Sequence, residues 1–338
     1  MTQYLRASII KTGCAAIFLL LSQISIAADQ QSELVIATGA KGGTYYPMGV
    51  ALAQLISTYL PSFNVKVRET SGGVENIRLL KNGDAALAFV NAGIAWDASS
   101  GQDAFRDQRT ELRAIAALSP NTMHIVVNDN SGIKTLADLK GRKVSTGPAG
   151  SGTEVIANRL FKAYGLQRGS DLTAVSLGPR ESAAALESGQ IDAFFFGGAT
   201  PVAAINALSQ NSKIKIRLME HAAAVKKMNM NYGPLYQIGK IPAGTYKDQG
   251  AEVGALDVWD LLVANEKLDG RVAYEIMRLI FEHKDELVKA SSNLAALRLE
   301  TQEKSAVITL HPGAQRYLAE HGVQPFARQF GMTGMRSK

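Results

Sequence analysis

The chain has 338 residues, a formal net charge of +6 at pH 7 and a single cysteine. The length favours two domains. The mild positive charge comes without a run of basic residues interleaved with aromatic ones, so we expect no nucleic-acid partner. Because the cysteine is Cys14, inside a segment that we expect to be removed, the mature chain would have no disulfide, thiol nucleophile or cysteine metal site.

Residues 1–28 have the pattern of a secretory signal peptide. A basic start precedes an apolar core at residues 15–26, which is too short to span a membrane. Small residues follow, and they suit cleavage after Ala27 or Ala28. We therefore expect a protein that is exported to the periplasm. An uncleaved N-terminal anchor is the alternative.

A glycine-rich turn follows the first expected strand. Residues 34–37 are apolar, Gly42-Gly43-Thr44 forms the turn, and Pro47 stands where the first residues of a helix favour proline. Apolar side chains in residues 48–59 then recur at helical spacing. This stretch predicts a strand, a turn and a helix.

Two later turns have the same build. One is Thr70-Ser71-Gly72-Gly73, and the other runs from Gly147 to Glu154, where Ser151 and Glu154 fit a capping box. Glycine lets the backbone turn tightly, and the free N–H groups and positive dipole end of a helix start suit a carboxylate or a phosphate. The sequence therefore predicts a ligand held by several helix starts. Ordinary capped turns are the alternative.

Strand and helix patterns alternate along the chain. We expect strands near 34–37, 64–68, 85–90, 112–118, 124–127, 142–146, 172–177, 191–196 and 214–218. A strand or mixed segment is expected at 255–264, after a loop-rich stretch at 233–254, and a helix is expected at 272–289. The alternation predicts open, mostly parallel α/β sheets flanked by helices. Because the pattern restarts after residue 123, it favours two lobes.

Several short motifs follow one another in a characteristic order and spacing. They are Thr38-Gly39, Gly42–Pro47, Ser71–Ile77, Asn82–Ala85, Gly150–Glu154, Gly189–Phe195, Ile241–Tyr246 and His311–Ala314. Together they resemble the TAXI family of solute-binding proteins, the periplasmic components of TRAP transporters. The resemblance covers nearly all of residues 33–323. Family members often carry an acidic residue where this chain has Gly93, and Lys41 is not typical of the first loop.

The resemblance implies a two-lobed periplasmic-binding-protein fold of type II, in which the chain crosses between the lobes twice. We place the crossings near 119–124 and 254–258. Residues 29–122 and 255–330 would then form lobe I, residues 123–254 would form lobe II, and residues 331–338 would be a flexible tail. Because ligands of α/β sheets lie beyond the carboxyl ends of the strands, the glycine-rich turns of the two lobes would face each other across the cleft.

The candidate ligand contacts come from these turns and from the strands beside them. They are Lys41, Gly42, Gly43, Thr44, Tyr45, Ser71, Asn91, Gly150, Ser151, Gly152, Thr153 and Phe196. The alternatives are that the hydroxyls only cap helices, that Asn91 is a turn residue and that Lys41 is a solvated charge. Which of Tyr45 and Tyr46, and which residue of 194–196, faces the cleft stays open.

Catalytic patterns do not stand out. The five histidines neither pair at i,i+4 nor fall in a His-Glu-x-x-His motif. Ser151 has glycine on both sides, but a nucleophile elbow needs glycines two residues away, where Ala149 and Thr153 stand. The first loop lacks the Gly-Lys-Ser/Thr ending of a phosphate loop. We therefore expect no enzyme activity, no metal and no cofactor.

The sequence thus predicts a monomeric periplasmic receptor of a TRAP-type secondary transporter. It would bind a small organic anion, either a dicarboxylate or an acidic amino acid such as glutamate or 2-oxoglutarate, and deliver it to TRAP membrane permease subunits. A ligand sensor that feeds a membrane regulator and an enzyme on the same fold are the alternatives.

Overall fold

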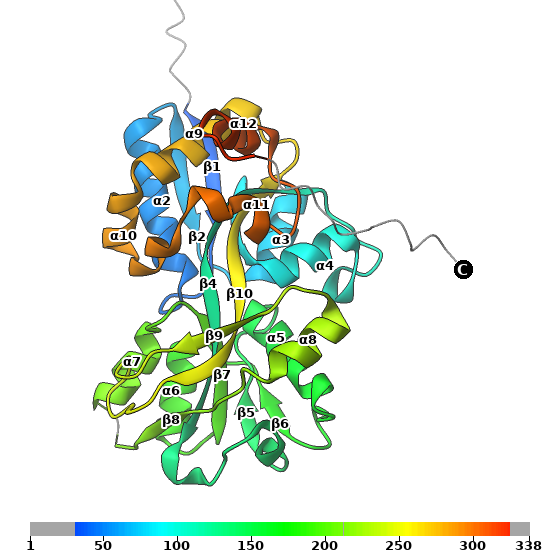
Figure 1. The fold of residues 1–338 in the computed structure, drawn as a ribbon, viewed down its shortest axis with the longest axis vertical. Helices are drawn as coiled ribbons and strands as arrows, with labels where there is room; N and C mark the ends of the chain where they lie inside the picture. The colour runs from blue at the N-terminus through cyan, green and yellow to red at the C-terminus, as the bar shows by residue number, and fades with distance from the viewer. Residues whose placement is uncertain (1–30, 212, 325–338) are drawn as a thin grey trace, which may run out of the picture.

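The computed structural model describes residues 31–211 and 213–324, so the expected signal peptide and the tail at 331–338 lie outside the described residues. The chain forms two lobes joined by two long strands (Figure 1). These strands, β4 (Leu112–Asn128) and β10 (Val253–Asn265), run antiparallel from one lobe into the other. The predicted two-lobed α/β architecture is confirmed.

The first lobe contains three parallel strands, each followed by a helix. The strands are β1 (Ser32–Ala37), β2 (Phe63–Arg68) and β3 (Leu87–Asn91), and the helices are α2 (Tyr45–Tyr59), α3 (Gly73–Asn82) and α4 (Ala92–Ser100). The order is β2-β1-β3, and β10 then pairs antiparallel with β3. The end of the described chain adds the helices α9 (Gly270–Glu282), α10 (Lys284–Ala290), α11 (Gln302–Ser305) and α12 (Pro312–Glu320) to this lobe.

The second lobe repeats this plan around β4. Its parallel strands are β5 (Lys143–Ser145), β6 (Thr173–Val175) and β7 (Ala193–Gly198), in the order β4-β7-β5-β6. Its helices are α5 (Gly152–Ala163), α6 (Pro179–Glu187), α7 (Ala203–Asn211) and α8 (Ala224–Tyr232). Two further strands, β8 (Ile216–Leu218) and β9 (Gln237–Ile241), pair antiparallel with β4 and β10. Short 3-10 turns lie at Asp103–Phe105, Asp129–Ser131, Leu136–Leu139, Ser292–Ala296 and Leu299–Thr301.

Three expectations from the sequence need correction. Residues 112–118 and 124–127 are one strand, β4, because its partner changes from β10 to β7 at Thr122 without a break in the extended backbone. The single helix expected at 272–289 is two helices: α9 ends at Glu282, because His283 has a φ of −109° and a ψ of 26° that depart from helical values, and α10 begins at Lys284. The stretch expected to be loop-rich, 233–254, contains β9.

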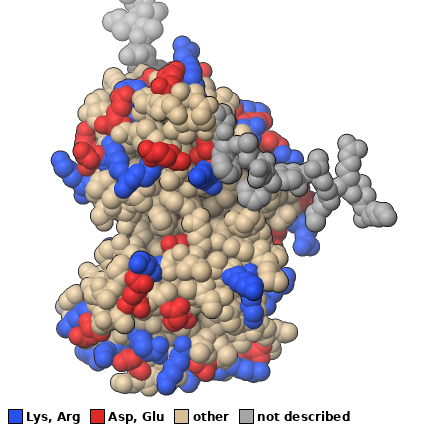
Figure 2. Space-filling view, viewed as in Figure 1, with Lys and Arg blue, Asp and Glu red and all other residues tan. Residues whose placement is uncertain are grey.

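Successive side chains of β7 point to opposite faces of the sheet, and each face is covered by a different apolar cluster. Phe195 belongs to the large buried cluster that includes α5, whereas Phe194 and Phe196 belong to a smaller cluster on the opposite face of β7. Among the described residues, no helix is both long and apolar enough to cross a membrane. On the face drawn in Figure 2, charged side chains lie mainly over the two lobes, and the narrow waist between them is largely uncharged.

Gly313, in the first turn of α12, tests how closely this lobe is packed. A Cβ there would collide with the carbonyl oxygen of Gly270 and lie 2.8 Å from the backbone nitrogen of Tyr274, so α12 would have to shift. We expect Gly313→Ala to lower the free energy of unfolding by about 1–3 kcal/mol. In Gly270→Ala, the control, the added Cβ meets nothing within 4 Å. Thermal unfolding of both variants checks this; equal melting temperatures would contradict it.

Candidate functional site

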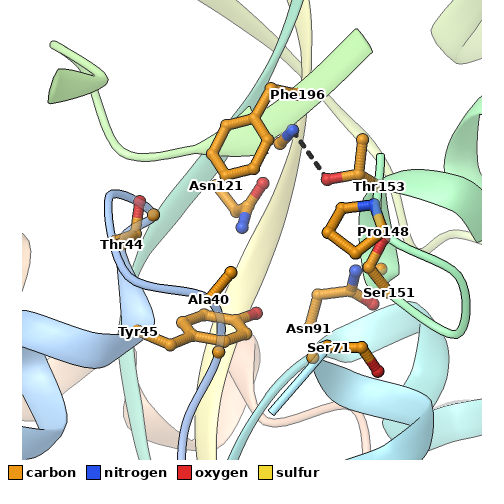
Figure 3. Close-up of a pocket in the computed structure, with 15 residues that line it drawn as sticks. Ala40, Thr44, Tyr45, Ser71, Asn91, Asn121, Pro148, Ser151, Thr153 and Phe196 are labelled. Atoms are coloured by element: carbon orange, nitrogen blue, oxygen red, sulfur yellow. Dashed lines mark hydrogen bonds between the residues drawn. The ribbon is translucent and has the colours of Figure 1, made fainter. Parts of the chain in front are cut away.

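A small cavity lies where the two lobes meet, and residues from both lobes line it (Figure 3). The space open to the centres of water-sized molecules is ≈ 50 Å³, enough for a small molecule. None of the lining residues is charged. They are Gly39, Ala40, Gly43, Thr44, Tyr45, Ser71, Gly72, Asn91, Asn121, Pro148, Ser151, Gly152, Thr153, Phe196 and Gly197.

Four helices begin at this cavity. The residues at their N-caps are Thr44 for α2, Gly72 for α3, Asn91 for α4 and Ser151 for α5, and all four line the cavity. The first N–H groups of a helix have no partner within the helix, and the helix dipole adds a partial positive charge there. In α2 the Thr44 side chain makes no capping hydrogen bond, and in α3 the N-cap residue is glycine, so neither cap occupies the first N–H groups of its helix, although the Val74 N–H of α3 donates to the Gly150 carbonyl. Such an arrangement binds anions.

Three hydroxyl groups around the cavity are held as donors. The oxygen of Thr44 accepts the N–H of Ala199 at 3.0 Å, that of Ser151 accepts the N–H of Glu154 at 3.1 Å, and that of Thr153 accepts the N–H of Gly197 at 3.0 Å. Because each oxygen already accepts a backbone proton, its own O–H can be donated to a ligand. Capping and ligand contact are therefore compatible roles for Ser151.

The Ser71 hydroxyl, in contrast, has its proton already engaged. Its hydroxyl donates to Glu75 Oε2 at 2.7 Å, and the same carboxylate oxygen accepts the backbone N–H of Ser71 at 2.8 Å. The Ser71 oxygen can therefore only accept a proton from a ligand. Thr44, Ser151 and Thr153 thus each keep one proton to donate and one lone pair, whereas Ser71 offers only lone pairs.

A buried polar cluster connects the cavity with the two crossing strands. Asp260 of β10 is fully buried and accepts hydrogen bonds from the Tyr45 hydroxyl at 2.5 Å and from Asn121 Nδ2 at 2.9 Å. Burial raises the pKa of Asp260 to about 7, although these two hydrogen bonds act to lower it. The carboxyl group thus changes its charge close to neutral pH.

The lobes are in contact beside the cavity, so the structure is a closed arrangement. The backbone N–H of Val74 donates to the carbonyl of Gly150 at 3.0 Å, and the Thr44–Ala199 bond also joins the lobes. Asn91 packs so closely on Gly152 that a Cβ at position 152 would collide with its Nδ2. Glycine is therefore required at 152 for the lobes to approach each other this closely.

Arg159 of α5 forms a second connection between the lobes. Its Nη2 lies 2.5 Å from Asp97 Oδ2 and 2.6 Å from Asp103 Oδ2, both in the first lobe, while Nη1 donates to the Tyr236 hydroxyl at 2.8 Å. The guanidinium also lies over the ring of Tyr232. Burial raises the pKa of Asp97 and Arg159 lowers it, so the carboxylate depends on this partner.

The structure brings most of the predicted ligand contacts together. Gly43, Thr44, Tyr45, Ser71, Asn91, Ser151, Gly152, Thr153 and Phe196 line the cavity. Lys41, Gly42 and Gly150 lie outside the lining. Lys41 Nζ is 3.4 Å from Glu69 Oε2, and Gly42 packs against the side chain of Arg180. Of the two tyrosines left open, Tyr45 is the one that faces the cavity.

Sequence reasoning missed the other lining residues: Gly39, Ala40, Gly72, Asn121, Pro148 and Gly197. Five of them adjoin the predicted turns or β7 and could have been included with them. Asn121 lies far from any turn, and its only signal was an amide in the segment assigned to a crossing. Within the described ranges, no group of three or more His, Cys, Asp or Glu side chains could hold a metal ion.

Comparison with known proteins identifies the family of the chain and relates its fold to solved structures. A family model described as the NMT1-like family matches residues 36–322. The chain belongs to the NMT1-like family. Among solved structures, MatC from Rhodopseudomonas palustris with bound malate is 16% identical to this NMT1-like protein, with a TM-score of 0.55 over 86% of this chain and 97% of that chain. This likeness supports the type II binding-protein fold.

Two further solved structures resemble the chain less closely in three dimensions. The periplasmic aliphatic sulphonate binding protein SsuA from Escherichia coli is 18% identical, with a TM-score of 0.45 over 86% of this chain and 83% of that chain. The GluR0 ligand-binding core from Nostoc punctiforme in complex with L-glutamate is 17% identical, with a TM-score of 0.45 over 76% of this chain and 97% of that chain.

The raised pKa of Asp260 predicts a pH dependence of stability. Because the folded state binds the proton more tightly than the unfolded state, whose ordinary pKa is 3.8, this stabilisation is fully present below about pH 4 and is lost as the pH rises through about 7. Asp260→Asn removes it. We expect the free energy of unfolding of the wild type, relative to the variant, to fall by roughly 4 kcal/mol between pH 4 and pH 8. Denaturant unfolding at several pH values measures this, and a constant difference would contradict it.

The Arg159 contacts predict an effect on lobe closure. In Arg159→Met the carboxylate of Asp97 would remain buried without its cation, a loss that costs about 3–5 kcal/mol in the closed arrangement. We therefore expect the variant to open, with a larger radius of gyration in small-angle scattering without ligand. Arg278→Met, which removes two surface ion pairs within α9, is the control. A scattering profile equal to that of the wild type would show that Arg159 does not hold the lobes together.

Proposed function

We propose that this NMT1-like protein is the solute-binding receptor of a TRAP-type secondary transporter, of the TAXI kind, and performs no chemistry. It binds a small organic anion, a dicarboxylate or an acidic amino acid, between its lobes and delivers it to a membrane permease. The observation that carries this proposal is the convergence of four helix starts on one uncharged cavity between the lobes.

The distribution of these helices over the lobes supports a receptor that closes on its ligand. The starts of α2, α3 and α4 come from the first lobe, and the start of α5 comes from the second. A ligand that touches both sets is bound more tightly by the closed arrangement, so it shifts the population toward closure. Because dipoles rather than full charges hold the anion, opening the lobes removes part of its binding and favours release.

The transporter type and the ligand class rest on further support. The order of the motifs between residues 33 and 323 supports a TAXI receptor, and MatC, which shares the fold, was solved with malate, a small dicarboxylate. We further propose that residues 1–28 are removed on export, that residues 29–122 and 255–330 form one lobe and residues 123–254 the other, and that the protein acts as a monomer.

The proposal is tested by ligand-induced stabilisation. A ligand at a hundredfold excess over its Kd stabilises the folded state by about 2.7 kcal/mol, which raises the melting temperature of a chain of this size by several degrees. We expect such shifts, together with contraction in small-angle scattering, for dicarboxylates or acidic amino acids and not for sugars or metal cations. A sugar or a cation that gives the largest shift, or an acid shift without contraction, would contradict the proposal.

Thr44 provides a matched pair of variants for the same measurement. Thr44→Val removes a hydroxyl that can donate to the anion, and a hydrogen bond to a charged ligand is worth about 1.5–3 kcal/mol. We expect the Kd of the best acid in the screen to rise roughly 10- to 100-fold by calorimetry. Thr58→Val, at an exposed position of the same helix whose hydroxyl bonds to the Gln54 carbonyl, should leave the Kd unchanged. Equal affinities would remove Thr44 from the site.

A further inference from the structure

A fully buried carboxyl group lies directly behind the wall of the cavity. Asp260 Oδ1 accepts hydrogen bonds from the Tyr45 hydroxyl at 2.5 Å and from Asn121 Nδ2 at 2.9 Å, and Oδ2 lies 3.1 Å from the same nitrogen. Tyr45 and Asn121 line the cavity, whereas Asp260 does not (Figure 3). A ligand in contact with either of these two side chains is therefore one layer of side chains away from the carboxyl group.

In the part of the chain that the structure describes, no cation offsets the charge of Asp260. The two groups that bond to it are neutral, and its cross-strand neighbours, Asn91 of β3 and Ser119 of β4, carry no charge either. Tyr45 of α2 is the titratable group in contact with it. Burial and the neighbouring Asp260 raise the pKa of Tyr45 well above its usual value, so the hydroxyl keeps its proton.

Two of the converging helix starts take the place of a cation. Tyr45 is the first residue of α2, and Asn91, which pairs with Asp260 across the strands, is the N-cap of α4. The partial positive charges of these starts stabilise an ionised Asp260 in the empty site. An anion in the cavity competes for the same starts, and its charge repels that of Asp260. Burial leaves this repulsion weakly screened by salt.

We infer that the cavity binds its anion together with a proton from the solvent, and that Asp260 takes up this proton. The inference rests on the proposed anion receptor and makes the proton a second ligand of the same site. Protonation removes the negative charge that faces the anion. It also preserves most of the local geometry: with the proton on Oδ2, Oδ1 still accepts from Tyr45 and Asn121, and the 3.1 Å contact is the one that is lost.

The sign of the pH dependence follows from this arrangement. Burial raises the pKa of Asp260 to about 7, so in the empty protein the carboxyl group is mostly ionised at pH 8. A bound anion raises this pKa further, because it disfavours the charged form. The complex therefore holds the proton more tightly than the empty protein does. By linkage, the anion binds more tightly when Asp260 is already protonated, and its affinity falls as the pH rises above 7.

Proton uptake is counted by calorimetric titration in two amine buffers of different ionisation enthalpy, Tris and triethanolamine, which offer no competing anion. The probes are succinate, malate, 2-oxoglutarate and glutamate, whose carboxyl groups are ionised from pH 7 to pH 9. For the acids that bind, we expect uptake of roughly half a proton or more at pH 8, and a Kd about tenfold higher at pH 9 than at pH 7. Binding without uptake at pH 7, 8 and 9 would overturn the inference and leave the anion receptor standing. If no acid binds, the proposed function itself fails.

A matched pair of variants assigns the proton to Asp260. In Asp260→Asn we expect no uptake and the same Kd at pH 7 and pH 9. Asp257→Asn is the control: Asp257 lies on the same strand and burial raises its pKa to about 6, but its carboxyl group lies against Gly239 and does not line the cavity. This variant should take up as many protons as the wild type. Uptake that persists in Asp260→Asn would show that another group receives the proton.

Infrared difference spectroscopy of the wild type decides the question if Asp260→Asn does not fold. Addition of succinate at pH 8 should produce the C=O stretching band of a protonated carboxyl group, which the ionised ligand cannot supply. If succinate is not a ligand, the acid that bound in the titration replaces it. Binding without such a band would contradict the inference.

Discussion

The closed structure depends on an electrostatic constraint: four helices direct ends of the same polarity at one small cavity. Partial positive charges at such short range repel one another in a medium of low dielectric constant. Three of these ends are fixed in place, because α2, α3 and α4 each follow a neighbouring strand of the first lobe. Only the start of α5 is brought up by closure, and in the proposed function the bound anion offsets the repulsion that closure creates.

Closure also forms contacts that do not involve the ligand. The Val74–Gly150 backbone bond and the Arg159 contacts with Asp97 and Asp103 join the same two lobes. These contacts favour the closed arrangement, and the converging helix ends oppose it. When two opposing terms leave a difference of a few kcal/mol, a ligand with modest differential affinity can move the population between open and closed.

The parts of the site that the sequence predicts are those with local signals. Glycine, serine and threonine before an amphipathic helix mark a helix start within about ten residues, so Thr44, Ser71 and Ser151 were found from their own surroundings. The direction of the Lys41 side chain cannot be predicted from the residues next to it in the sequence, because this side chain pairs with Glu69 from the next strand-to-helix turn. A charge on a flexible stem takes whichever partner the fold brings near, and no short motif encodes that partner.

Asn121 and Asp260 escaped prediction for a different physical reason. From the sequence, one expected strand ends at residue 118 and a crossing between the lobes lies near 119–124, so no pairing is expected for this segment. In the structure this segment pairs with β10, and the register of that pairing shifts between Asp260 and Leu261, so the irregularity is absorbed without ending the strand. Whether such a segment pairs depends on a strand more than a hundred residues away.

The position of these two residues separates two roles within the site. Asn121 and Asp260 lie on β4 and β10, the strands that both lobes share, whereas the helix starts belong to one lobe or the other. A group that contacts Asn121 stays bound to the connection between the lobes in either arrangement. Carboxylates that contact the helix starts are fully bound only when the lobes meet. A ligand in this cavity would thus meet the shared strands in either arrangement, and it would meet the helix starts of both lobes only in the closed one.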